Sequence, residues 1–295
     1  MTLAPPPTRA GGIAQSFAIL RLVVARPSGA LGLALTLAHI AVALLAPWIA
    51  PYDPTALNAA AIQQAPSAAH WLGTDSLGRD VLSRVLWGGQ VAIAVTAAAA
   101  AIAVTWGGIA GILFGLIGGR LDEIAMRIVD AFLSIPWLLF LLLIISIGGS
   151  GPATIIPTLG FFYGVAVIRV ARAAAMQVAA RDFVTAARAR GERLWSILSR
   201  ELFPNVADVL LVEGAMRWSW MLLAFSSLSF LGFGATPPTP DWGLMVAQER
   251  GFMATAPWSV FWPCAALSSL IIGINLLADA LGKALGLDRA TAAPV

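Results

Sequence analysis

The stretch HWLGTDSLGRD gathers ionisable side chains and is the first place to look for chemistry. It holds one imidazole, His70, and two carboxylates, Asp75 and Asp80. One histidine with two aspartates five residues apart is poor spacing for metal ligands, and no nucleophile, base and orienting group stand together. The stretch therefore predicts neither a metal site nor a catalytic site.

The same carboxylates suit a structural role at the start of a helix. Each aspartate has an arginine one helical turn further along the chain, Arg79 and Arg84, so ion pairs are expected. Thr74 or Asp75 can cap the helix that follows. We expect a lid or a helix start here.

A second ionisable pair, Glu213 and Arg217, stands inside an apolar run. A charge at the centre of a bilayer costs about 2.5–3.5 kcal/mol, but residues four apart share a helix face and can pair. Two interpretations remain open: a self-neutralising pair that faces the bundle interior, or a contribution to a solute pathway. Other candidates to line such a pathway are Phe132, Ser134, Ser226 and Ser229.

Nucleotide and disulfide chemistry find no support in the sequence. The only lysine, Lys283, stands in DALGKALG, which lacks the Gly-x4-Gly-Lys-Ser/Thr spacing of a phosphate loop. The single cysteine, Cys264, has no partner for an intrachain disulfide. Because a convergent catalytic set is also missing, we expect no enzyme activity, bound cofactor or metal in this chain.

Composition indicates which elements must position these residues. The 295 residues are 59% hydrophobic and 11% charged, with a mean hydropathy of +0.85, whereas soluble domains carry about 25% charged residues. This is the composition of an integral membrane protein. The pI of about 9.7 reflects few acidic residues, since the net charge is only +3, and it does not indicate a nucleic-acid-binding surface.

Six apolar segments are long enough to cross a bilayer, which needs about 20 residues of helix. They cover roughly residues 29–50, 88–118, 128–148, 153–175, 206–234 and 258–282. Small residues at four-residue spacing, such as Gly107, Gly111 and Gly115, would let neighbouring helices approach closely. We therefore expect an all-α integral membrane protein with six transmembrane helices.

The basic residues indicate how the bundle is oriented. If the N-terminus is cytoplasmic, fourteen of the eighteen lysines and arginines fall on the cytoplasmic side, three fall outside and Arg217 lies within a span. The cytoplasmic set includes Arg169 and Arg172, assigned to the fourth loop. Because basic residues accumulate in cytoplasmic loops, both termini are predicted to be cytoplasmic.

The largest cytoplasmic loop, at about residues 176–205, contains TAARARGERLWSILSRELFPN. It predicts two short helices around a turn at Gly191, the second of them amphipathic. Pro204 should end that second helix, because proline lacks a donor and disfavours helix at the preceding residue. An arginine-rich amphipathic helix can lie on anionic membrane lipid or dock into a groove of a partner, and the pattern leaves both open.

The loop resembles the EAA loop of permease subunits of bacterial ABC importers. Ala186, Ala187, Gly191 and Pro204 stand at the spacing of that family, whereas Thr185 replaces its glutamate. Four further stretches resemble the C-type subunit of the dipeptide and oligopeptide group (peptide, opine and nickel uptake): APWIAPYDP, HWLGTDSLGRDVLSR, SLSFLGFGATPPTPDWG and NLLADAL. Together they cover most of residues 20–287 in the order of the family.

This resemblance implies a type I (MetI-like) importer permease fold and a set of partners. They are a second, homologous permease, two cytoplasmic ATPase subunits that hold ATP and Mg²⁺, and a periplasmic solute-binding protein. The loop helix would dock in an ATPase cleft, and the residues implied in this coupling are Thr185, Ala186, Ala187, Arg188, Gly191, Trp195, Leu198 and Pro204. A glutamate at position 185 could pair with a partner arginine, so that ion pair should be missing or displaced.

We therefore expect a multi-pass permease of the bacterial inner membrane that imports dipeptides or oligopeptides. It would comprise a cytoplasmic segment (1–28), a six-span domain (29–283) and a cytoplasmic tail (284–295). Its two charged or proline-rich outer loops would be either structural or contacts for the binding protein. Nickel, opines or another small solute are alternative cargoes. A self-contained secondary transporter is the alternative class, but it would need internal repeats with interrupted helices, and the sequence has no convincing repeat.

Overall fold

A computed structural model describes residues 12–287, and every regular element in that range is helical. Five helical runs are long and apolar enough to cross a membrane. They are α2 (Pro27–Ile49), α3 (Val81–Ile117), α6 (Pro152–Ala179), the run Leu194–Phe230 and α11 (Trp258–Ala284). Shorter elements are α1 (Gly12–Val24), α4 (Gly119–Leu133), α5 (Trp137–Gly148), α7 (Asp182–Ala189), α10 (Trp242–Glu249) and the 3₁₀ turns Ala59–Ala61 and Arg250–Phe252.

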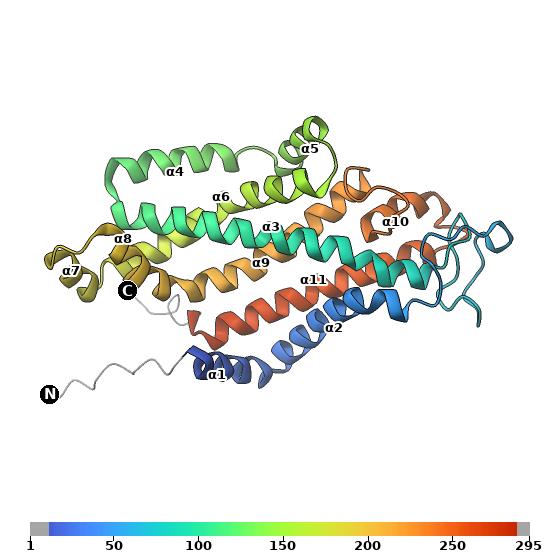
Figure 1. Cartoon of the computed structure of the whole chain (residues 1–295), viewed down its shortest axis with the longest axis horizontal. Coiled ribbons are helices and arrows are strands. Elements are labelled where there is room, and N and C mark those ends of the chain that lie inside the picture. The colour runs from blue at the N-terminus through green and yellow to red at the C-terminus, as the bar shows by residue number, and fades with distance from the viewer. Residues whose placement is uncertain (1–11, 288–295) are drawn as a thin grey trace.

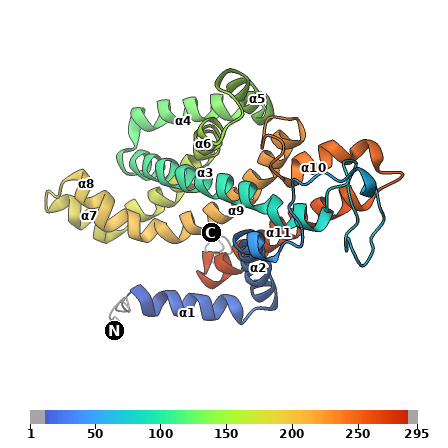
Figure 2. The same cartoon turned by 45° about the vertical axis from the view of Figure 1, so that its right-hand side comes forward.

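The long helices lie side by side along the longest axis of the molecule (Figure 1). The helices α4 and α5 lie along one edge of this bundle, and α1 lies along the opposite edge (Figures 1 and 2). One end of the bundle carries α7, and we call it the loop end. The other carries α10 and the long segment between α2 and α3, and we call it the α10 end. The expected all-α bundle is confirmed.

The predicted third span, residues 128–148, is not one straight helix. It falls on α4 and α5, which are bent by 82° at the break between Leu133 and Trp137. The break contains Pro136, which lacks a backbone donor and disfavours helical geometry at Ile135. Apolar composition alone predicted a continuous helix here, whereas α4 and α5 form at most a broken sixth span.

The most extensive contact between two helices of the described bundle is that of α3 with α6, and glycines let their backbones approach closely. A Cβ at Gly107 would lie 2.3 Å from the carbonyl oxygen of Gly164, and one at Gly111 would lie 2.5 Å from that of Ile168. At Gly115 the distance to the Arg172 carbonyl would be 2.8 Å. The predicted role of these small residues in close helix approach is therefore confirmed.

Parts of two predicted segments lie outside the described residues. Arg9 falls before residue 12 and Arg289 falls after residue 287, so neither is placed. The described part of segment 1–28 consists mainly of α1, and α2 begins at Pro27. The described part of segment 284–295 ends three residues beyond α11, at residue 287.

Gly111→Ala should lower the free energy of unfolding by about 1–3 kcal/mol, because the backbone of α3 or α6 must shift to admit the methyl group. Gly282→Ala is the matched control. Its Cβ would meet only Val212 Cγ1, at 3.7 Å, so the better helix propensity of alanine should leave it neutral or slightly stabilised. Thermal unfolding in detergent micelles measures both variants, and equal midpoints would contradict backbone-close packing of α3 on α6.

Candidate functional site

A helical arm, residues 182–202, stands at the loop end (Figure 1). It consists of α7, a turn, the single-turn helix α8 (Leu194–Ser196) and a π-helical segment (Ile197–Leu202). Gly191 in the turn has φ +74°, a backbone conformation that other residues adopt only with strain. The predicted pair of helices around Gly191 is therefore confirmed.

The predicted helix stop at Pro204 is wrong. The arm continues without a break into α9 (Phe203–Phe230), and Pro204 lies in the first turn of that helix. Just before it, the Phe203 N–H donates to the Leu198 carbonyl, five residues back rather than four. This wider π-helical hydrogen bond lies directly before Pro204, the residue that has no backbone N–H to donate. Proline is tolerated in the first turn of a helix, so α9 can begin there. Loop helix and span are thus one continuous element.

One side of the arm is buried against the bundle. Its residues Val184, Ala187, Ile197, Leu198 and Leu202 are at most 3% exposed, and they share an apolar cluster with residues of α3 and α6 such as Ile112 and Val167. The other side is exposed and includes Thr185, Ala186, Arg188, Gly191 and Trp195. Of the predicted coupling residues, Ala187 and Leu198 therefore pack inside this chain, and Trp195, 67% exposed, points away from it.

Two arginines of the arm already have partners within the chain. Arg188 Nη2 donates to the Leu116 carbonyl at 2.9 Å, which satisfies a free carbonyl in the last turn of α3. Arg190 Nη2 lies 2.6 Å from Glu192 Oε1, and this hydrogen bond holds the pKa of the Glu192 carboxyl below its usual range. These contacts fix the arm to α3 and close the turn around Gly191.

Arg169 and Arg172 lie on α6, so their predicted place in the loop is wrong. Arg172 makes two hydrogen bonds to Asp122 of α4, from Nε to Oδ1 and from Nη2 to Oδ2, each of 2.5 Å. Arg169 Nη1 lies 3.6 Å from Asp130 Oδ1, also on α4. These pairs join α4 to α6, and α6 continues past the predicted end of its span at residue 175, to Ala179.

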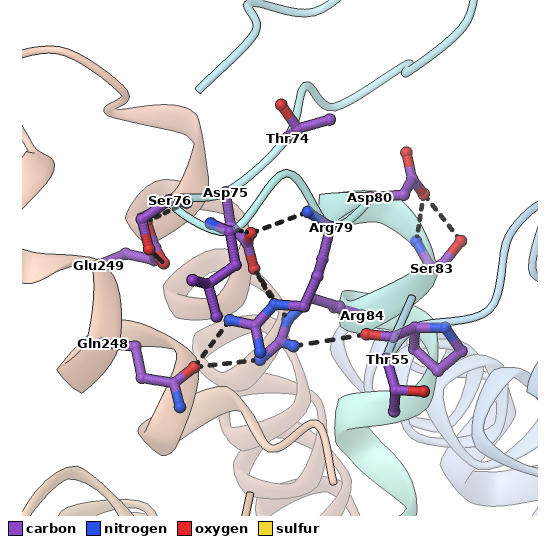
Figure 3. Close-up of polar contacts among 12 residues, drawn as sticks. Thr55, Thr74, Asp75, Ser76, Arg79, Asp80, Ser83, Arg84, Gln248 and Glu249 are labelled. Carbon is purple, nitrogen blue, oxygen red and sulfur yellow. Dashed lines mark hydrogen bonds and ion pairs between the residues drawn. The ribbon is translucent and has the colours of Figure 1, made fainter. Parts of the chain in front are cut away.

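A buried polar cluster joins the segment before α3 to α10 at the opposite end of the bundle (Figure 3). Asp75 Oδ2 accepts from Arg79 Nε at 2.6 Å and lies 3.5 Å from Arg84 Nε. Gln248 Oε1 accepts from Nη2 of both arginines, at 3.1 and 3.3 Å. We call these four residues, with Ser76 and Glu249, the α10 cluster.

The charged residues of the α10 cluster are almost completely buried, whereas Ser76 and Gln248 are half-buried. Asp75, Arg79, Arg84 and Glu249 are each at most 4% exposed. The Glu249 carboxylate accepts from the Ser76 hydroxyl at 2.7 Å and from its backbone N–H at 3.1 Å. Because charges this deeply buried are stable only when paired and hydrogen-bonded, the cluster holds α10 against the outer segment.

The helix cap lies at Asp80, so the predicted cap at Thr74 or Asp75 is wrong. Asp80 Oδ2 accepts from the backbone N–H and the hydroxyl of Ser83, both at 2.8 Å, and α3 begins at the next residue. Asp80 Oδ1 lies 2.9 Å from His70 Nδ1. The predicted pair of Arg79 with Asp75 is confirmed, but Arg84 turns to Asp75 rather than Asp80, because Asp80 is occupied by the cap.

The proline-rich PPTPDWG loop is held in place by contacts with α3 and with the start of α10. The Trp242 side chain is 4% exposed, donates from Nε1 to the Val85 carbonyl at 2.9 Å, and covers Gly88 on α3, where a Cβ would lie 2.7 Å from its ring. Asp241 caps α10 by accepting from the Leu244 N–H at 3.1 Å, and burial raises the pKa of its carboxyl to about 6. The structural role of both outer loops is confirmed, and their contact with a binding protein stays a prediction.

Two cavities follow one side of α9, and together we call them the α9 lane. Arg217 lines a cavity of about 280 Å³, Ser226 lines one of about 380 Å³, and Leu223 borders both. The expected pair forms, because Arg217 Nε donates to Glu213 Oε1 at 2.5 Å. Of the predicted pathway residues, the structure thus brings Glu213, Arg217 and Ser226 to this side of α9.

The remaining pathway candidates lie elsewhere. Ser229 is fully buried and stands beside Gly234 and Asp241, away from the lane. Phe132 packs edge-on against Phe161, with 5.6 Å between ring centroids, in a separate apolar cavity between α3, α4 and α6. Ser134 occupies the break after α4, where its hydroxyl donates to the Ala131 carbonyl.

Some site residues had no recognisable signal in the sequence. The lane has an aromatic wall of Trp137, Phe162, Tyr163 and Trp220, contributed by three helices. Only the three-residue spacing from Arg217 to Trp220 and Leu223 could have indicated one shared helix face. Gln248 and Glu249 were also missed, because their partners lie 164 to 173 positions away along the chain.

Comparison with known proteins identifies one matching family. Residues 107–288 match the family described as binding-protein-dependent transport system inner membrane component. A dipeptide transport system permease protein of Haemophilus influenzae is 35% identical over 261 residues, 86% of this chain and 88% of the relative. A glutathione transport system permease protein of Pectobacterium atrosepticum is 34% identical over 247 residues (83% and 82%). A nickel transport system permease protein of Escherichia coli is 34% identical over 240 residues (81% and 87%).

Arg79→Met should lower the free energy of unfolding by about 3–5 kcal/mol, because it leaves the buried Asp75 carboxylate without its nearest cation. Lys283→Met is the matched control. Lys283 and Asp279 form a pair of the same spacing and the same 2.6 Å length, but their side chains are 40% and 50% exposed, so the loss should stay below about 1 kcal/mol. Chemical or thermal unfolding measures both, and similar losses would show that burial does not set the strength of the α10 cluster.

Proposed function

Because this chain belongs to the family of binding-protein-dependent transport system inner membrane components, the permeases of ABC importers, we propose that it moves dipeptides or oligopeptides across the bacterial inner membrane. The predicted family, the type I permease fold and the function of an importer permease are confirmed by the family match and the relatives. The chain is a multi-pass membrane protein, and its relatives are named as permease subunits rather than as enzymes.

Two features support peptides as the cargo. Relatives of similar identity are named for dipeptide, glutathione and nickel transport, and the first two solutes carry both carboxylates and apolar groups. The α9 lane combines an aromatic wall with one arginine, which suits such solutes. None of the residues that line the Arg217 cavity is a histidine, cysteine, aspartate or glutamate, the side chains that could ligate a nickel ion, so nickel is the less favoured alternative.

We assign the loop end to the cytoplasm. The arm and its flanks carry Arg181, Arg188, Arg190, Arg193 and Arg200 at this end, all of them exposed. At the α10 end, Arg79 and Arg84 are buried in ion pairs, so they add little to the exposed charge there. The excess of exposed positive charge at the loop end over the α10 end is thus larger than the count of basic residues along the sequence suggests. This excess favours a cytoplasmic loop end.

The arm is the proposed contact with the ATPase subunits, which would bind ATP and Mg²⁺ and hydrolyse the ATP. The observation that carries this proposal is the continuous helix from Leu194 to Phe230, because it connects the exposed face around Trp195 to the side of α9 that borders the lane. Movement of an ATPase that grips Trp195 would then move the lane between two arrangements. Thr185 is exposed and offers only a hydroxyl, so we place the strongest docking contact at Trp195.

The remaining partners follow the same division of the molecule. A second, homologous permease and two ATPase subunits would complete the importer. A periplasmic solute-binding protein would dock at the α10 end, where large apolar side chains stand exposed on the loops: Leu57 (71%), Trp71 (72%) and Met253 (57%). The contacts of the α10 cluster hold those loops in place, so we expect them to form a rigid surface for that protein.

Trp195→Ala should reduce peptide uptake by at least about ten-fold, because truncating a central tryptophan removes much of the binding energy of an interface. Uptake and ATP hydrolysis are measured on the complete transporter in proteoliposomes. Folding should be unaffected, since this side chain is 67% exposed. Trp48→Ala, which removes a 78% exposed tryptophan from the last turn of α2, is the control and should keep normal uptake. Normal uptake by Trp195→Ala would refute the docking role.

A further inference from the structure

Arg217 stands in the middle of a membrane span with most of its donors unused. A guanidinium group carries five N–H donors, and here only Nε is engaged, with Glu213 Oε1 at 2.5 Å. Its two terminal nitrogens have no hydrogen-bond partner among residues 12–287. The Arg217 side chain is 26% exposed and that of Glu213 is 12% exposed, and Arg217 but not Glu213 lines a cavity beside α9.

Arg172 provides a comparison, because its carboxylate partner engages two of its nitrogens. Arg172 on α6 makes two parallel hydrogen bonds to both oxygens of Asp122, at 2.5 Å each. That fork-to-fork geometry uses the recognition face of the guanidinium completely. Glu213 neutralises the charge of Arg217 through Nε alone, so the two terminal nitrogens remain available to a further acceptor.

The open face of Arg217 borders the smaller cavity of the α9 lane. Among the residues that line this cavity of about 280 Å³, Arg217 is the only charged one. The aromatic wall of Trp137, Phe162, Tyr163 and Trp220 surrounds it. The volume is just below the range for ligand cavities, about 300–1,000 Å³, and a largely apolar wall with few convergent polar groups is typical of them.

The second cavity of the α9 lane lies against α10, since Trp242, Gly243 and Val246 are among its lining residues. This cavity of about 380 Å³ shares Leu223 with the Arg217 cavity and follows α9 to Ser226, Ser227 and Phe230. The break between α4 and α5 also borders the lane, through Leu133 and Trp137 on its two sides. Irregular backbone at membrane depth occurs where it is buried in protein or lines a cavity, so the break fits a solute path here.

We propose that Arg217 binds the carboxylate of the transported solute through its two free terminal nitrogens, with Glu213 as the residue that positions it. The aromatic wall would pack against the side chains of the solute. Every linear peptide ends in one carboxylate, whatever its side chains, so this single contact can serve peptides of varied sequence. The proposal rests on the peptide importer function proposed above and adds the group of the solute that is recognised.

Photocrosslinking tests the contact without interference from the binding protein. The assembled transporter (this chain, the second permease and both ATPases) is placed in nanodiscs and exposed to a dipeptide that contains benzoylphenylalanine, or to the same dipeptide as its C-terminal amide. Mass spectrometry counts the adducts on this chain. The wild type should favour the free carboxylate by at least about ten-fold, the effect of one hydrogen-bonded charge pair, with adducts on α5 and α9.

Three variants distinguish a direct contact from a general effect. Arg217→Gln should label equally with both peptides, at the low level of the amide. Arg217→Lys should be intermediate, since it keeps the charge but loses the planar fork. Arg169→Gln is the matched control, because it removes an arginine from the neighbouring span α6 that does not line the lane, and it should keep the wild-type preference.

Any other outcome would refute either the contact of Arg217 with the solute or the proposed peptide function. A carboxylate preference that survives in Arg217→Gln would refute the contact while leaving the peptide importer function intact. Loss of the second permease from purified Arg217→Gln complexes would show that the open face pairs with a carboxylate of that subunit, which also refutes the proposal. If the wild-type transporter does not label with either peptide and, with its binding protein added, does not take them up in proteoliposomes, the proposed peptide function itself is wrong.

Discussion

The burial of Ile197, Leu198 and Leu202 against α3 and α6 determines how the two ends of the molecule can act together. These side chains belong to the loop, yet they pack as core residues, and the π-helical segment that carries them continues into α9. The arm therefore has little freedom to move by itself. A force on its exposed face would be passed to α9, and with it to the lane along that helix.

Electrostatics impose a second constraint on the same scaffold. Each charge removed from water in a span or an outer loop needs a partner, and the structure provides one for Arg172 and for Arg79. The Arg172 pair joins α4 to α6, whereas Arg79 pairs with Asp75 of its own segment and also donates from Nη2 to Gln248 of α10. Arg217 differs, because Glu213 engages only its Nε and no second side chain among the described residues accepts from its terminal nitrogens, which face the lane.

Composition and hydropathy were sufficient to predict the class of protein and the location of five spans. The turn at Gly191 could be predicted because it depends on the local backbone preference of glycine. Features that depend on contacts between distant segments were missed. Pro204 predicted a helix end, but the preceding π turn carries the helix past it. The break at Pro136 divides an apolar run that predicted one span. Gln248 has partners 164 and 169 positions away, which no local pattern can indicate.

The central claim is that the arm and α9 move as one rigid element. Spin labels at Ser199→Cys on the arm and Met216→Cys on α9, with Leu44→Cys on α2 as reference and Cys264→Ala as background, would test it in the complete transporter. Electron–electron resonance gives the distances with and without ATP. We predict an unchanged distance between positions 199 and 216 while both move relative to position 44. A changed 199–216 distance with a fixed 216–44 distance would place a hinge in the π segment and contradict the claim.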